Sequence, residues 1–238
     1  RDTDRSRGLG DVYKRQNASC HLGKKLVLKL DISHFFDSIL FPRVYGAAFP
    51  EILFPPAAAM LLTSLCCCNE RLPQGSPASP AISNLVMRPF DIYMDGWCRE
   101  RGIAYTRYCD DMTFSGDFDA AALCSKVRSY LEAMGFTLNE KKTKLLTGDV
   151  RQSVTGIVVN DKLQVSREYR KKLRQEVYYC KKYGIDAHLE RVEADTGIRW
   201  EKERYICSVQ GRLRFVLQVN PQDDEFAGYC REWKELFM

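Results

Sequence analysis

The first half of the chain contains a short apolar run and two longer stretches with helical spacing. Residues 26–32 (LVLKLDI) form a Val/Leu/Ile run of strand length. Residues 55–68 (PPAAAMLLTSLCCC) are typical of a helix with prolines in its first turn. Residues 79–97 carry apolar side chains at helical spacing, which predicts a second helix, bent at Pro89.

A hairpin and a third helix are predicted next. The segments IAYTRY and MTFS, within residues 103–115, flank the polar pair Asp110 and Asp111 and predict a β-hairpin with that pair at its turn. The third helix is predicted to begin after Asp117, as its N-cap, and to end at Gly135. This order of elements favours an α+β fold, an antiparallel sheet with helices on one face.

The second half of the chain is more basic and mainly helical. Residues 141–182 contain 12 Lys and Arg against 4 Asp and Glu, a local charge of +8 (12 − 4). Residues 153–166 (SVTGIVVNDKLQVS) predict a small hairpin that turns at residues 160–161. Ser166 is predicted to cap a basic helix that ends near Gly184, and further helical stretches follow.

Composition narrows the class of protein. The chain has 238 residues, 45% hydrophobic and 28% charged, with a net charge of +5, which is typical of a folded chain of one or two domains. No apolar run approaches the roughly 20 residues of a membrane span. Ten irregularly spaced cysteines and only three histidines argue against a zinc site or a disulfide framework. We therefore expect no membrane association and a cytoplasmic location.

The first sixteen residues differ from the rest of the chain. RDTDRSRGLGDVYKRQ is charged and shows neither helical nor strand periodicity, so we interpret residues 1–16 as a foreign or disordered leader. Its last part, DVYKRQ, looks like translated sequencing-adaptor sequence. We therefore expect a natural amino-terminal part to be missing.

Three carboxylates are the candidate catalytic groups. Asp31 ends an apolar strand, and Asp110 and Asp111 lie at a hairpin tip about eighty residues later, so they can meet across one sheet. Nucleotidyl transfer by two Mg²⁺ ions requires such a cluster of hard oxygen ligands. Taken alone, an Asp-Asp pair in a turn is more often only a solvated turn, so the surrounding motifs decide between the two interpretations.

Those motifs resemble the palm motifs of reverse transcriptases. LDISHFF contains Asp31, LPQGSPASP (residues 72–80) precedes a helix, and YCDD ends the first strand of the hairpin. The three stand in the order and spacing of that family. The resemblance implies an α+β right-hand polymerase palm followed by a mainly helical thumb.

The resemblance also implies roles for individual residues. Asp31, Asp110 and Asp111 would be the catalytic carboxylates, and Asp31 and Asp110, with the carbonyl of Ile32, would bind the two Mg²⁺ ions most directly. Lys142, in NEKKTK, would protonate the pyrophosphate leaving group, although a solvated basic turn is an equally good interpretation of that lysine.

The nucleotide site is implied in the same way. Phe36 falls at the position of the steric gate, a ring that excludes a ribose 2′-OH, and so predicts the use of dNTPs. Its neighbour Phe35 is expected in the core. Gln74 and Gly75 would line the nucleotide site and the template groove.

Two short signatures point to the bacterial retron type. NASCH, with Asn17 and His21, fits one of them, and VTG, residues 154–156, fits the other. We predict RNA contacts at these positions and on the basic helix. The predicted RNA-binding residues are Asn17, His21, Val154, Thr155, Gly156, Arg170, Lys171, Lys172 and Arg174.

The resemblance predicts three segments. Residues 1–16 would be the leader, 17–152 the palm with a remnant of the fingers, and 153–238 the primer-grip hairpin and thumb. Most of the fingers, which supply cations to the triphosphate, would be missing. We therefore expect weak or no polymerase activity from these residues alone, and robust primer extension would contradict that expectation.

The resulting hypothesis is a retron RNA-directed DNA polymerase that copies a cognate structured RNA from dNTPs. Its partners would be that non-coding RNA, the RNA/DNA hybrid and an effector protein, with a role in antiviral defence. Two alternatives stay open. One is another bacterial reverse transcriptase, of the group II intron or diversity-generating type, and the other is an RNA-binding antiphage scaffold with a vestigial site.

Overall fold

The chain folds into two compact units. The computed structural model describes the backbone of residues 9–237 and the side chains of residues 14–237. The sheet unit comprises Lys24–Val150, and the helical unit combines residues 9–23 with residues 151–237. Residues 17–23 therefore pack with the second half of the chain, whereas the predicted boundaries placed them in the palm.

The sheet unit is built on a five-stranded antiparallel sheet with strand order β2-β3-β1-β4, in which β5 also pairs with β1. The strand β1 is the apolar run predicted from the sequence. Its apolar side chains favour a buried, central position, and it pairs with a strand on each side. The strands are β1 (Leu26–Ser33), β2 (Ala104–Tyr108), β3 (Asp111–Gly116), β4 (Thr137–Leu138) and β5 (Lys144–Thr147).

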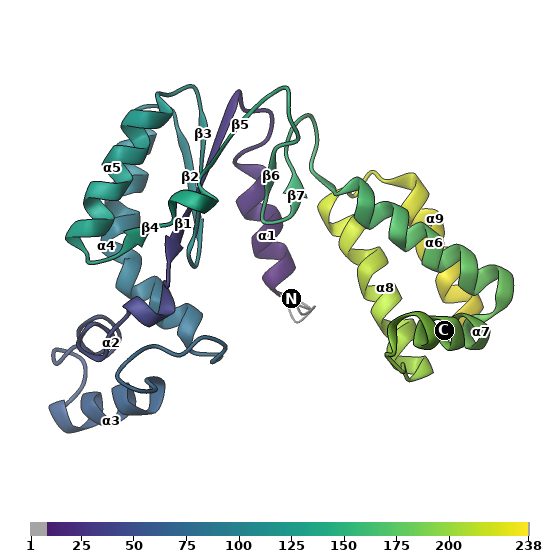
Figure 1. Cartoon of the computed structure of the whole chain (residues 1–238), viewed down its shortest axis with the longest axis horizontal. Helices are drawn as coiled ribbons and strands as arrows, with labels where there is room; N and C mark the ends of the chain where they lie inside the picture. The colour runs from purple at the N-terminus through teal and green to yellow at the C-terminus, as the bar shows by residue number, and fades with distance from the viewer. Residues whose placement is uncertain (1–8, 238) are drawn as a thin grey trace. The chain divides into compact units, whose positions relative to one another are not determined.

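Alternation along β1 gives the sheet two different faces. Leu28, Leu30 and Ile32 are buried in the hydrophobic core, whereas Lys29 and Asp31 point to the other face. The helices α4 (Ser79–Arg99) and α5 (Ala120–Ala133) lie together on one side of the sheet (Figure 1). This arrangement agrees with the predicted α+β class.

The remaining elements connect these layers. A 3-10 helix, η1 (Phe36–Ser38), follows β1, and the helices α2 (Phe41–Ala48) and α3 (Pro56–Cys66) lead to α4. A second 3-10 helix, η2 (Glu140–Lys142), follows β4. The predicted N-cap of α5 was wrong by two residues. Asp119 accepts hydrogen bonds from the amides of residues 121 and 122, whereas Asp117 pairs with Lys25 at 3.0 Å.

The predicted leader contains a helix. Residues 1–8 of the leader lie outside the described part, but α1 (Leu9–Ser19) is helical, which corrects the prediction for residues 9–16. This helix packs against α8 and the short strands β6 and β7 of its own unit. Tertiary packing therefore supplies the stability that the weak periodicity of this segment does not indicate.

The predicted small hairpin is a three-stranded sheet. Its strands are β6 (Ser153–Val154), β7 (Ile157–Val158) and β8 (Gln164–Val165), in the order β6-β7-β8. Thr155 and Gly156 form an additional two-residue turn with φ of 48° and 83°. Two successive positive φ values suit the primed turns that join short antiparallel strands. The segment that we predicted as one strand therefore reverses on itself.

Four helices complete the helical unit. They are α6 (Arg167–Tyr183), α7 (Ile185–Thr196), α8 (Lys202–Val219) and α9 (Asp224–Phe237). The predicted cap of α6 is confirmed, because the Ser166 hydroxyl accepts the Tyr169 amide at 3.2 Å. Phe226 and Trp233 of α9 are buried in this unit. No described helix is long and apolar enough to cross a lipid bilayer.

A buried histidine makes the stability of the helical unit depend on pH. His188 is 7% exposed and its Nε2 lies 2.9 Å from the Tyr205 hydroxyl, facing Glu176, Arg191 and Arg212. Burial lowers the pKa of His188 below its ordinary value. The unfolded chain therefore binds the proton more readily, so this contribution is complete above about pH 6.5 and is lost as pH falls below it.

We expect acidification from pH 7.5 to 5.5 to lower the unfolding free energy through this group, by at most about 1.4 kcal/mol per pH unit. The substitution His188→Phe keeps an aromatic ring and abolishes the titration. Chemical denaturation at several pH values measures the difference between the two proteins. Equal pH slopes for wild type and His188→Phe would refute this assignment.

Candidate active site

Asp31 is the best-fixed of the three predicted carboxylates. It is 6% exposed on β1, opposite Asp111 of β3 in the strand register. Its Oδ1 accepts a hydrogen bond from Lys142 Nζ at 2.9 Å, and its Oδ2 accepts one from Asn139 Nδ2 at 3.1 Å. The backbone N–H of Asn139 also donates to the backbone carbonyl of Asp31 at 2.8 Å. Both carboxylate oxygens are therefore oriented by the segment that follows α5.

Asp110 lies in the tight turn between β2 and β3. Tyr108 pairs with Asp111, so Cys109 and Asp110 form a two-residue turn. Cys109 has a φ of 53°, a left-handed conformation that residues other than glycine adopt rarely. The Asp110 carbonyl accepts the Ile32 amide at 3.3 Å, which ties the turn to the end of β1. This bond holds the Asp110 side of the turn next to Asp31.

The pKa shifts of Asp110 and Asp111 indicate that these two carboxylates lie close to Asp31. Burial raises the pKa of Asp110 above its ordinary value, and the charges of Asp111 and Asp31 raise it further. Burial and the charge of Asp31 likewise raise the pKa of Asp111. The charge of Asp31 therefore makes the ionised forms of Asp110 and Asp111 less favourable, and the charge of Asp111 does the same for Asp110.

Lys142 is positioned to compensate this charge. Its side chain is 62% exposed, and its hydrogen bond to Asp31 raises its pKa, as do the charges of Asp110 and Asp111. Lys142 is therefore protonated at neutral pH. Sequence reasoning missed Asn139, the other donor to Asp31, although it begins the NEKKTK segment from which Lys142 was selected.

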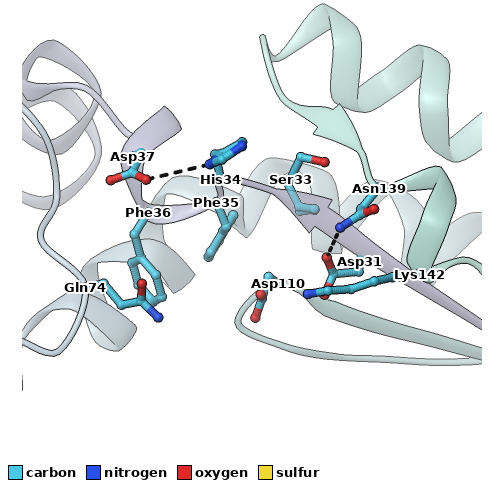
Figure 2. Close-up of a pocket in the computed structure, with 11 residues that line it drawn as sticks. Asp31, Ser33, His34, Phe35, Phe36, Asp37, Gln74, Asp110, Asn139 and Lys142 are labelled. Atoms are coloured by element: carbon cyan, nitrogen blue, oxygen red, sulfur yellow. Dashed lines mark hydrogen bonds and ion pairs between the residues drawn. The ribbon is translucent and has the colours of Figure 1, made fainter. Parts of the chain in front are cut away.

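One cavity of about 350 Å³ brings most of the predicted residues together. Figure 2 shows Lys142 extending past Asp31 toward Asp110 on one side, and Phe36 beside Gln74 on the other. Asp111 and Gly75 are not part of its lining. The lining residues are Asp31, Ile32, Ser33, His34, Phe35, Phe36, Asp37, Gln74, Asp110, Asn139 and Lys142.

The Phe36 side of the cavity packs on the hydrophobic core, and the loop on its Gln74 side is anchored to α4. Phe35 is 3% exposed, which confirms its predicted core position. Its ring packs edge-on against that of Phe36, with the two ring centroids 5.3 Å apart. Gly75 has a φ of 95°, a backbone conformation that glycine adopts readily. The Ser79 hydroxyl donates to the Pro73 carbonyl at 2.7 Å and anchors this loop to α4.

The chemistry of this lining fits a hard divalent cation. The carboxylates of Asp31 and Asp110 and the carbonyl of Ile32 offer oxygen atoms, the ligands that Mg²⁺ prefers. A cation would also relieve the repulsion that raises the pKa of Asp110. Within the described part of the chain, no three His, Cys, Asp or Glu side chains already converge as metal ligands. Joint coordination by all three carboxylates therefore requires some side-chain rearrangement.

The two predicted signature segments meet in the helical unit. The helix α1, which carries Asn17, contacts β6 and β7, and the Thr155 hydroxyl donates to the Lys14 carbonyl at 3.2 Å. His21 and Val154 are fully buried, whereas Gly156 is exposed at the turn. His21 and Val154 are therefore not accessible from the surface, whereas Asn17 and Thr155 are half-buried.

The four predicted cations of α6 divide into two pairs. Arg170 forms ion pairs with Asp223 and Glu225, and Arg174 pairs with Glu225 as well, so both hold α6 to the start of α9. Lys171 and Lys172 are exposed on α6. The structure therefore assigns a packing role to the two arginines and leaves the two lysines on the surface.

A comparison with solved structures agrees with this fold. The telomerase of Candida albicans, solved in complex with a TWJ fragment of telomeric RNA, matches with a TM-score of 0.52 at 11% identity, over 95% of this chain and 52% of that one. The shared fold is the α+β polymerase palm with a helical thumb.

The sequence comparisons define the family. The model for "Reverse transcriptase (RNA-dependent DNA polymerase)" matches residues 3–179. The chain belongs to the reverse transcriptase family. The curated relatives that it matches are retron reverse transcriptases.

Two curated relatives illustrate the similarity. The retron Mx65 reverse transcriptase of Myxococcus xanthus is 35% identical over 233 residues, 89% of this chain and 50% of the relative. The retron Ec86 reverse transcriptase of Escherichia coli is 32% identical over 209 residues, 86% of this chain and 59% of the relative. The chain thus spans about half the length of the curated relatives that it matches.

Proposed function

We propose that the protein is the RNA-directed DNA polymerase of a retron, which synthesises DNA from dNTPs on a cognate structured RNA in the bacterial cytoplasm. The observation that carries this proposal is the single cavity that joins Asp31, Asp110 and Lys142 to Phe36 and Gln74. The residues that we propose as metal ligands, proton donor and nucleotide contacts thus line one cavity, apart from Asp111 and Gly75. Family membership and the retron relatives support the same activity.

The carboxylates have the first role in this mechanism. Asp31 and Asp110, with the Ile32 carbonyl and with Asp111 beside them, would hold two Mg²⁺ ions. Bound there, Mg²⁺ supplies activation of the attacking hydroxyl and neutralisation of the triphosphate. Asn139 keeps the Asp31 carboxylate oriented through its 3.1 Å hydrogen bond.

Lys142 and Phe36 have the other two roles. The raised pKa of Lys142, which results from its hydrogen bond to Asp31, keeps its ammonium charged and able to donate a proton to the departing pyrophosphate. The Phe36 ring, fixed by Phe35, would lie beneath the sugar and exclude a 2′-hydroxyl. Gln74 would contact the nucleotide or the template from the opposite side.

A single-nucleotide incorporation assay with Mg²⁺, dNTPs and a primed RNA template tests the proposed function. Because most of the fingers would be missing, we expect only weak incorporation by these residues, and that incorporation should require Mg²⁺ and the correct templated base. Incorporation that ignores the template would contradict the proposal. If loss of Asp110 and Asp111 left the biological activity intact, the RNA-binding scaffold would be the better interpretation.

The surface lysines of α6 are proposed RNA contacts. The double charge reversal Lys171→Glu with Lys172→Glu should weaken binding of structured RNA by about tenfold or more and should flatten its dependence on salt, because each lost phosphate contact lowers the salt slope by roughly one. Filter binding at several salt concentrations measures both quantities. The matched control, Arg231→Glu with Lys234→Glu, reverses two exposed cations of α9 in the same unit. Equal losses for both pairs would show that only net charge matters.

A further inference from the structure

A buried arginine connects the turn of the active site to the helix behind it. The Arg107 side chain, on β2, is 4% exposed. Its Nε and Nη2 donate to the Asp91 carboxylate of α4 at 2.8 and 2.6 Å, and Nη2 also donates to Asn84 at 3.2 Å. Its remaining arm, Nη1, donates to the Cys109 carbonyl at 2.8 Å. Every arm of the guanidinium therefore has a partner.

This arrangement is built for fixed geometry. Burial acts to lower the pKa of Arg107, but its bonds to Asp91 raise it above the ordinary value, so the charge is retained inside the fold. The Tyr105 hydroxyl donates to the same Asp91 at 2.8 Å and fixes the carboxylate from a second direction. A planar guanidinium in a fork-to-fork pair has little freedom to rotate, unlike a lysine ammonium.

The bond to Cys109 falls on the most constrained residue of the turn. Cys109 holds a φ of 53°, a conformation that is strained for a residue other than glycine and persists only where the surroundings enforce it. Arg107 fixes the Cys109 carbonyl from the helix side, and the Ile32 amide fixes the Asp110 carbonyl from the β1 side. The two peptide groups that flank Asp110 are thus each held by one hydrogen bond.

We propose that Arg107, clamped by Asp91, is a positioning residue that keeps Cys109 in its left-handed conformation and thereby directs the Asp110 carboxylate into the cavity with Asp31. The helix α4 carries Asp91 and also anchors the Gln74 loop through Ser79, so one helix sets the positions of two sides of the site. The kinetic part of this proposal rests on the proposed polymerase function. The conformational part does not.

The experiment removes the clamp without leaving a buried charge. The double variant Arg107→Met with Asp91→Leu replaces the ion pair by apolar side chains, a change that is often neutral for stability. We expect kcat to fall by about 100-fold, the loss that a misplacement of about 1 Å produces, with the KM for dNTP changed less than about threefold. Hydrogen exchange of the amides of residues 108–111 should become at least about tenfold faster through local opening of the turn.

Replacement of the strained residue provides the decisive arm. Glycine adopts positive φ freely, so adding Cys109→Gly to the clamp-free double variant should restore part of the lost kcat. The same substitution in the wild type should bring no gain. The pair Arg99→Met with Asp95→Leu removes another ion pair of α4, 2.8 Å long and away from the turn, and serves as the matched control.

The possible results distinguish failure of the Arg107 clamp from failure of the proposed polymerase function. Unchanged exchange at residues 108–111, or a kcat loss that Cys109→Gly does not reduce, would overturn the clamp. If the double variant does not fold, Arg107→Lys keeps the charge but lacks the second arm, and the same exchange and rescue criteria apply to it. Incorporation that ignores the template would count against the proposed function and not against the clamp. If the wild type incorporates no nucleotide, kcat cannot be compared between variants, and the exchange measurement alone decides whether Arg107 holds the turn.

Discussion

The substitution Asp110→Asn is expected to reduce nucleotide incorporation by about 1,000-fold or more, equivalent to about 4 kcal/mol of transition-state stabilisation. The amide keeps the shape of the side chain but removes a charge that shares the cavity with Asp31. Single-turnover incorporation at saturating dNTP measures the loss. Binding of Mn²⁺, followed by its electron paramagnetic resonance, provides a readout independent of turnover and should weaken in parallel.

The effect of Asp110→Asn on stability should be opposite to its effect on activity. Because burial and neighbouring charges raise the pKa of Asp110, the folded state binds a proton more readily than the unfolded state, and this group disfavours folding increasingly as pH rises. Asp110→Asn should therefore leave the unfolding temperature unchanged or higher at pH 7. The control Asp149→Asn, at an exposed position outside the cavity, should affect neither activity nor Mn²⁺ binding. An active Asp110→Asn protein would remove this residue from the mechanism.

The substitution Phe36→Ala is expected to lower the preference for dNTPs over rNTPs by about 100-fold or more, because discrimination here depends on a steric clash rather than on attraction. Phe36 is only partly buried, so its truncation should cost less than the roughly 3–5 kcal/mol of a fully buried ring. Competition between each dNTP and its rNTP on the same primed template measures the ratio.

Phe36→Tyr is the matched variant for this experiment. It keeps the bulk of the ring and should retain the preference for dNTPs, whereas Phe36→Ala should lose it. Unchanged discrimination in Phe36→Ala would move the sugar-contacting role to another wall of the cavity. Gln74 lies nearest to Phe36 in that lining and would be the next candidate (Figure 2).

The sheet unit was largely predictable because its signals are local and periodic. The strand β1 is a continuous apolar run, the hairpin flanks a polar pair, and α4 and α5 show helical spacing. The contributions of Asp31, Asp110 and Lys142 to one cavity followed from motif order rather than from periodicity. Asn139 and Arg107 escaped notice because their importance lies in single hydrogen bonds, to Asp31 and to Cys109, that no pattern of residue types encodes.

The helical unit was less predictable because its stability depends on distant partners. The helix α1 has weak periodicity and packs against α8 and a small sheet far along the chain. The charge of α6 predicted a basic surface, but Arg170 and Arg174 find their acids about fifty residues later, at Asp223 and Glu225. A local count of charges cannot distinguish a cation that faces solvent from one that binds another helix.

The two units of the chain differ in how their sequence segments are arranged. The helical unit is discontinuous in sequence, whereas Lys24–Val150 is one uninterrupted segment. Leu26 pairs with Thr147, so the two ends of that segment leave from neighbouring strands. Segments with adjacent ends are the ones that evolution inserts into, and removes from, host domains without breaking the host's chain path. Asp31, Asp110 and Asp111, the proposed catalytic carboxylates, therefore lie on one continuous segment with adjacent ends, the arrangement that exchange as a single block requires.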